Sequence, residues 1–219
     1  RPPRRRCRLH RIPVTLDQYR DLADRLLGPF VAAADRIGLT PDGVSIVAFG
    51  CAIAAGAAFA LATPAWYALG AAFVLANGWL DLVDGALARA QDTAGDGGDL
   101  LDHVLDRYAD IAMLVGLAAG IDAYALGLAA VTGVLMTSYL GTQIQAVGLG
   151  REYGGLVGRA DRLALIGIGG VVAAATLAVP AVPTRILGFG AIGWLLLLFA
   201  AVGHLTALQR FYYSTVALA

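Results

Sequence analysis

After residue 43 the chain consists largely of hydrophobic runs that few charged residues interrupt. A helix of about 20 apolar residues is long enough to cross the hydrocarbon core of a bilayer. Six runs lie at 44–64, 65–80, 98–121, 123–150, 163–183 and 186–209. The third run is apolar only from residue 111, so its helix must begin in the polar stretch near Gly98 if it is to span. The pattern predicts an all-α, polytopic membrane protein with six transmembrane helices over residues 41–219.

The segment 14–40 has a different pattern. Apolar residues such as Leu16, Leu26 and Phe30 recur there at helical spacing, beside a face of Asp and Arg. An amphipathic helix next to the first span is expected to be interfacial, lying along the membrane surface. Pro29 inside this helix predicts a kink. Residues 1–13 form a basic arm, which is either a solvated tail or a segment held to anionic lipid headgroups.

Composition and charge narrow the class further. Of the 219 residues, 58% are hydrophobic and only 15% are charged, which excludes a disordered chain. Two cysteines are too few for a disulfide scaffold. Arginine supplies all 16 basic residues, and when six spans alternate only Arg185 falls on the side opposite the N-terminus. This asymmetry predicts a plasma-membrane protein whose two termini and active site face the cytoplasm.

Acidic residues gather at the cytoplasmic ends of the second and third predicted spans. Asp81 and Asp84 are three residues apart, so they lie on one face of a helix. Asp102 and Asp106 are four apart and share a face of the next helix. Four carboxylates at the edge of the hydrocarbon repel one another unless a cation neutralises them, and their oxygens suit Mg²⁺ or Mn²⁺. The pattern indicates a metal site that holds a diphosphate; the alternative is a set of surface carboxylates in a cytoplasmic loop.

The complete spacing in this stretch is Asp81-x₂-Asp84-Gly85-x₂-Ala88-Arg89-x₈-Gly98-x₃-Asp102-x₃-Asp106. It resembles the signature of the CDP-alcohol phosphatidyltransferase family at every fixed position. The six-span count and the interfacial N-terminal helix are also similar to that family. The resemblance implies an enzyme of phospholipid biosynthesis that transfers a phosphatidyl or archaetidyl group from a CDP-activated lipid to a polar alcohol and releases CMP.

The resemblance also implies roles for the motif residues, position by position. The implied metal ligands are Asp81, Asp84, Asp102 and Asp106. Asp106 is also implied to be the catalytic general base for the acceptor hydroxyl. The implied cofactor is Mg²⁺ or Mn²⁺, bound as two ions. The implied CDP-binding residues are Asp81, Gly85, Ala88, Arg89 and Gly98.

The sequence defines the acceptor alcohol less narrowly than it defines the metal and CDP sites. Arg151, Arg159 and Arg162 follow the fourth run, and they either bind the acceptor or anchor this loop on the cytoplasmic side. Inositol phosphate and glycerol phosphate are acceptors that the resemblance implies. Family members that use them often carry arginines after a Ser-Tyr pair on the fourth span, where this chain has Gln143 and Gln145.

Two other functions fit part of the pattern. A membrane prenyltransferase also uses paired Asp motifs, Mg²⁺ and a diphosphate, but its two motifs lie far apart on more spans. A cation transporter would have broken helices and mid-membrane charges on repeated halves, whereas no internal repeat is visible here. The expected partners are the CDP-lipid, the alcohol, membrane lipids and a second copy of the chain as a homodimer. No nucleic-acid partner is expected.

Overall fold

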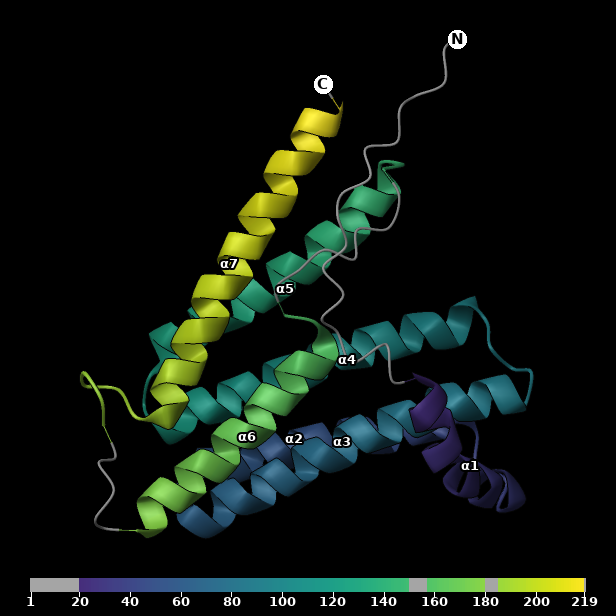
Figure 1. Ribbon diagram of the computed structural model, residues 1–219, viewed down its shortest axis with the longest axis horizontal. Helices are drawn as coiled ribbons and strands as arrows, with labels where there is room; N and C mark the ends of the chain where they lie inside the picture. Colours follow the sequence, from purple (N-terminus) through teal and green to yellow (C-terminus); the bar gives the residue numbers. More distant parts are fainter. Residues whose placement is uncertain (1–19, 150–156, 180–184, 219) are drawn as a thin grey trace.

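The computed structural model describes residues 20–149, 157–179 and 185–218, and helices make up almost all of these ranges (Figure 1). Seven helices follow one another there: α1 (Arg20–Arg36), α2 (Pro41–Ala60), α3 (Pro64–Ala90), α4 (Asp96–Gly120), α5 (Tyr124–Ala146), α6 (Arg159–Ala178) and α7 (Ala191–Leu218). Five of them, all except α1 and α4, are long and apolar enough to cross a membrane. The first half of α4 carries acidic and basic residues. The predicted all-α, polytopic membrane protein is confirmed.

Thr-Pro pairs start the first two long helices. The Thr40 hydroxyl accepts a hydrogen bond from the Gly43 N–H at 3.2 Å, and Pro41 opens the first turn of α2. Proline is favoured there because the first-turn N–H groups have no partner within the helix. Thr63 and Pro64 repeat the arrangement at the start of α3. These caps fix where each span begins.

The acidic motif lies on a helical hairpin formed by α3 and α4. α3 continues past its apolar run to Ala90, so Asp81 and Asp84 are inside the helix. α4 begins at Asp96, which confirms the predicted start near Gly98. α2 packs against both helices of the hairpin. The two carboxylate pairs are therefore carried by neighbouring helices rather than by a surface loop.

The last helix starts later than its hydrophobic run predicts. Residues 186–190 were expected in the sixth span, but Leu187 and Gly188 have φ values of 50° and 86°. Ile186 and Phe189 exchange two backbone hydrogen bonds around them. This tight turn precedes α7, which begins at Ala191. Hydropathy did not reveal the turn because its residues are as apolar as those of a span.

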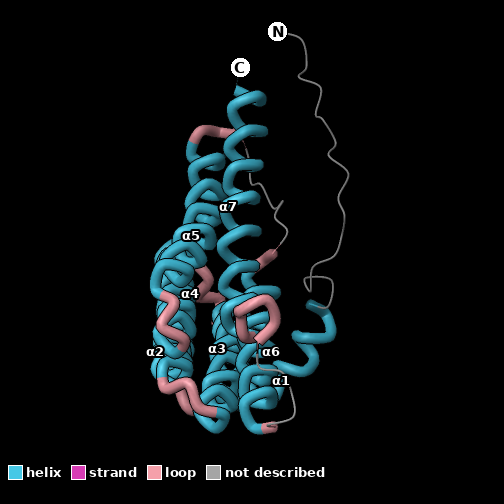
Figure 2. Tube along the Cα trace, turned by 90° about the vertical axis from the view of Figure 1, so that its left-hand side faces the viewer, coloured by secondary structure: helices cyan, strands magenta, loops and turns pink. Residues whose placement is uncertain are grey.

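Small residues allow the long helices to approach closely. A Cβ on Gly56 of α2 would meet the backbone of Ala112, and one on Gly116 of α4 would meet the backbone of Gly56. Gly203 of α7 meets the backbone of Gly133 in the same way. Such contacts are typical of helix pairs in membranes, where close packing replaces the hydrophobic effect as the driving force. They set the α2–α4 and α5–α7 pairs, and α5 and α7 run side by side, inclined to the other helices (Figures 1 and 2).

α1 is held against the motif end of α3. Leu27 is buried in a small apolar cluster with Val83 and Leu87 of α3. The rings of Phe30 and Trp79 meet edge to face, with centroids 5.1 Å apart. The apolar face of α1 thus packs on the bundle, while the predicted arm 1–13 and the start of the amphipathic segment lie outside the described residues.

Candidate active site

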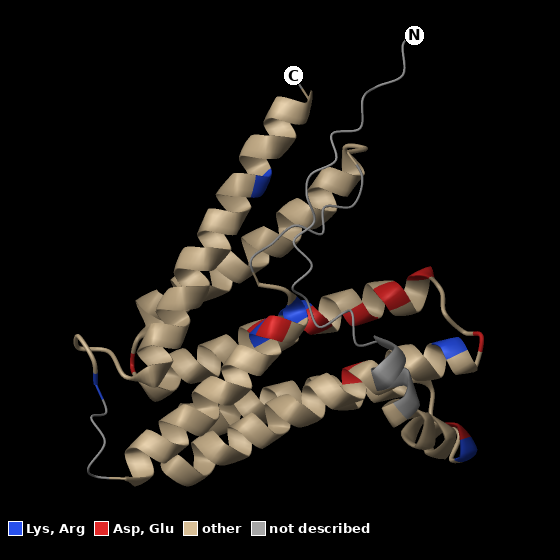
Figure 3. Ribbon diagram, in the orientation of Figure 1, with Lys and Arg blue, Asp and Glu red and all other residues tan. Residues whose placement is uncertain are grey.

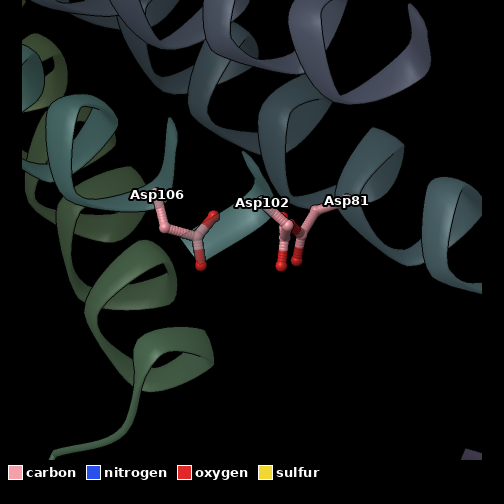
Figure 4. Close-up of side chains that lie close together, drawn as sticks. All are labelled: Asp81, Asp102 and Asp106. Atoms are coloured by element: carbon pink, nitrogen blue, oxygen red, sulfur yellow. The ribbon is translucent and has the colours of Figure 1, made fainter. Parts of the chain in front are cut away.

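Three carboxylates from the hairpin point into one shared space (Figure 4). Asp81 belongs to α3, and Asp102 and Asp106 belong to successive turns of α4. One oxygen from each lies within 4.8 Å of the others. Asp106 is buried, with 6% of its surface exposed, and the other two are half-buried. Three hard oxygen donors at this separation fit a Mg²⁺ or Mn²⁺ ion.

The fourth predicted ligand, Asp84, lines the same cavity but is not one of the three clustered carboxylates. Its Oδ2 accepts a hydrogen bond of 2.6 Å from the Ser45 hydroxyl of α2, and only 7% of the residue is exposed. Asn77 lies about two turns before Asp84 on the same side of α3, and it donates to the Ala48 carbonyl at 2.9 Å. The sequence analysis assigned no site role to Ser45 or Asn77, because each is a single polar residue within an apolar run.

Arg159 lies inside the carboxylate cluster. At the first residue of α6, its Nη1 and Nη2 each lie 2.5 Å from an oxygen of Asp81 and of Asp106, respectively. Arg107 approaches the other oxygen of Asp106 at 3.8 Å. Arg159 was predicted as an acceptor-binding residue. In the structure its guanidinium group contacts Asp81 and Asp106, which are two of the predicted metal ligands.

Arg162 lies one turn further along α6. Its Nη2 donates to Asp110 Oδ2 at 2.9 Å, and the residue is buried. It also lines a second cavity, between α5, α6 and α7, with Thr137, Gly203 and Thr206. The Nε atoms of Arg159 and Arg162 are buried without a hydrogen-bond partner among the described residues. Arg151, the third predicted acceptor residue, lies outside the described ranges.

The predicted CDP-binding residues continue along the hairpin from the carboxylates. Gly85 and Ala88 follow Asp84 on α3, and a Cβ added to Gly85 would lie 3.6 Å from Nη1 of Arg89. Gly98 is in the first turn of α4, where an added Cβ would lie 3.6 Å from a carboxylate oxygen of Asp42. Each of the two glycines therefore has a charged side chain next to its backbone. Asp42 lies in the first turn of α2.

The fold and the site define a class. A polytopic helical membrane protein whose clustered carboxylates fit a divalent ion, with arginines beside them, has the kinds of groups that phosphoryl transfer uses. The family model for CDP-alcohol phosphatidyltransferase matches residues 38–212, and the chain belongs to this family of multi-pass membrane transferases of phospholipid biosynthesis.

Relatives of the chain are similar over most of its length. An archaetidylinositol phosphate synthase from Methanothermobacter thermautotrophicus is 30% identical over 203 residues, which cover 90% of this chain and 93% of the relative. The phosphatidylinositol phosphate synthase of Mycobacterium tuberculosis with CDP-DAG bound superposes with a TM-score of 0.72 at 27% identity, covering 87% of this chain and 94% of that one. The same synthase in complex with manganese and citrate gives 0.73 at 26% identity, with 86% and 88% covered.

Proposed function

We propose that the enzyme transfers an archaetidyl or phosphatidyl group from a CDP-activated lipid to inositol phosphate, releasing CMP. The observation that carries the acceptor is the pair of arginines at successive turns of α6, each with a buried Nε–H that lacks a partner among the described residues. A phosphate group on the acceptor offers several oxygens to such donors. The names of the archaeal and mycobacterial relatives support the same acceptor.

The carboxylates have distinct proposed roles. Asp81, Asp84 and Asp102 hold Mg²⁺ or Mn²⁺, and Asp106 can contact a second ion. When bound, the metal neutralises the diphosphate and stabilises the leaving phosphate. The relative that contains manganese supports this assignment. Gly85, Ala88, Arg89 and Gly98, together with Asp81, line the space for the CDP group.

Asp106 is the proposed general base. Its carboxylate takes the proton from the acceptor hydroxyl, whose oxygen attacks the phosphorus attached to the lipid. The bond between this phosphorus and the CMP oxygen then breaks, and CMP leaves with the electron pair. Arg159 and Arg162, with Arg151 from the preceding loop, hold the phosphate of the acceptor so that its hydroxyl meets Asp106.

The proposed topology has six spans, α2 to α7, with α4 included. α4 has 25 residues, and only a short turn separates its end from the start of α5. The chain can therefore enter α5 only from the membrane face at which α4 ends. The charged side chains of α4 are confined to the half that faces the site, and residues 111–120 are free of charge. Arginine asymmetry supports a plasma-membrane enzyme with a cytoplasmic active site, and α1 supports an interfacial helix. A homodimer is the proposed assembly.

One experiment tests the reaction and the acceptor together. The purified enzyme is incubated with CDP-archaeol or CDP-diacylglycerol, Mg²⁺ and, in parallel, inositol phosphate, glycerol phosphate, inositol and serine. We expect CMP release and a new phosphoinositol lipid by mass spectrometry only with inositol phosphate. Transfer to glycerol phosphate instead would keep the family reaction and overturn the acceptor, whereas absence of CMP release with every alcohol would overturn the reaction.

A further inference from the structure

α4 carries one more acidic residue, Asp110, one turn after the last aspartate of the motif. It lies in the buried interior of the bundle, where an unpaired charge is costly. Asp110 follows Asp106 by one helical turn, and only 2% of it is exposed. A buried carboxylate is tolerated only when it is paired and hydrogen-bonded. Oδ2 of Asp110 accepts from Arg162 at 2.9 Å and from Arg107 at 3.3 Å. The carboxylate thus holds two guanidinium groups, one from its own helix and one from α6.

These ion pairs connect two helices that make little direct contact. α4 packs mainly on α2 and α5, whereas α6 packs mainly on α3 and α7, and α4 and α6 share few backbone contacts within the described residues. Two side-chain bridges cross between them at successive turns, from Arg159 to Asp106 and from Arg162 to Asp110. Figure 3 shows opposite charges gathered where the start of α6 approaches α4, with further acidic residues along α4 towards its start. Charged side chains therefore connect this end of α6 to α4, while its apolar residues pack on α3.

Asp110 reaches the carboxylate of Asp106 by two routes. Nη1 of Arg107 is held by Asp110, while its Nη2 lies 3.8 Å from Oδ2 of Asp106. Arg162 is fixed by Asp110, and one turn earlier in α6 Arg159 contacts Oδ1 of Asp106. Asp110 therefore holds one arginine that faces Asp106, and it holds a second arginine one turn after the Arg159 that faces the other oxygen of Asp106.

We propose that Asp110 is a positioning residue for the transfer reaction. It holds Arg107 and Arg162 so that the carboxylate of Asp106 is aimed at the acceptor hydroxyl. This inference rests on the proposed function, because it takes Asp106 as the base. Groups that orient a reacting or ligating residue typically change activity about 10–100-fold when they are replaced.

The test compares three variants by CMP release at varied CDP-lipid, varied acceptor and saturating Mg²⁺. Asp110→Asn keeps the shape and removes the charge that holds the two arginines. We expect its kcat to fall about 10–100-fold, with the KM for CDP-lipid close to that of the wild type. Asp110→Glu restores the charge and should recover part of this loss. Asp122→Asn removes the same charge from an exposed position beyond the far end of α4 and should leave kcat unchanged.

Binding and stability measurements separate positioning from a purely structural role. The melting temperature in detergent and Mn²⁺ affinity by titration are measured on the same samples. Positioning predicts that Asp110→Asn binds Mn²⁺ nearly as the wild type does, because Asp81, Asp84 and Asp102 are unchanged, while kcat falls. A parallel loss of melting temperature, Mn²⁺ affinity and kcat, with no recovery in Asp110→Glu, would overturn the proposal. A folded Asp110→Asn with wild-type kcat would overturn it as well.

Assays of the wild-type enzyme distinguish a wrong role for Asp110 from a wrong proposed function. All variants are assayed with the alcohol that gives CMP release in the wild-type enzyme. If that alcohol is not inositol phosphate, only the acceptor is wrong, and the role of Asp110 is still measured. If the wild-type enzyme releases no CMP with any alcohol, the proposed reaction is wrong, and the proposed role of Asp110 in that reaction is wrong too.

Discussion

Replacing Asp106 by Asn tests the proposed proton transfer with little change in shape. Asp106 is buried, and its two oxygens face Arg159 and Arg107. The amide oxygen of Asn can still accept a hydrogen bond from Arg159, so the contact between α4 and α6 should persist. The change removes the proton acceptor and leaves the clustered carboxylates of Asp81 and Asp102 in place.

The expected magnitude follows from the role. Loss of a general base typically slows a reaction about 10²–10⁴-fold. At about 1.4 kcal/mol for each tenfold, this corresponds to about 3–5.5 kcal/mol of transition-state stabilisation. Asp81→Asn and Asp84→Asn instead remove metal ligands, so they should weaken metal binding, and raised Mg²⁺ should restore part of their rate. The two classes of variant therefore differ in their response to metal.

The assay is CMP release at saturating CDP-lipid and acceptor, measured over a Mg²⁺ titration. Asp99→Asn serves as the matched control, because it neutralises an exposed carboxylate in the first turn of α4. We expect the control to follow the wild-type curve and Asp106→Asn to stay slow at every Mg²⁺ concentration. If raised Mg²⁺ returns Asp106→Asn to the wild-type rate, Asp106 is only a ligand and the general-base step is wrong.

Three further predictions address the metal, the topology and the packing. Chelation should abolish CMP release and added Mg²⁺ or Mn²⁺ should restore it, because the clustered carboxylates need a cation; full activity in excess chelator would contradict the metal role. With Cys7→Ser and Cys51→Ala as background, Gly95→Cys should react with an impermeant thiol reagent only in opened cells, and Arg185→Cys should react in intact cells. The reverse pattern would invert the topology. Gly56→Ala should destabilise the enzyme by about 1–3 kcal/mol, because its Cβ meets the backbone of α4. A Cβ added at Gly50 would meet no atom within 4 Å, so Gly50→Ala should leave the melting temperature unchanged. Equal melting temperatures for the two variants would refute the close contact at Gly56.

The sequence by itself determined most of the helices and which of them carry the motif carboxylates. Long apolar runs gave the spans, because in a membrane every backbone polar group must be paired within a helix. Spacings of three and four residues placed the Asp pairs on helix faces. These are local properties, because each is read within one apolar run or between residues one turn apart on one helix. The same reasoning failed at residues 186–190, where an apolar turn has the hydropathy of a span.

Only the tertiary structure decided which side chains from distant segments meet at the site. Ser45 contacts Asp84 across 39 residues of sequence, and Arg162 contacts Asp110 across 52. No hydrophobic period predicts such pairs, because lipid is as apolar as the helices and partner choice depends on glycine contacts and single polar residues. Packing of α2, α3 and α4 brought three carboxylates within 4.8 Å, and α6 then supplied Arg159 to two of them. The motif specified the carboxylates, and the arrangement of the helices decided their basic neighbours.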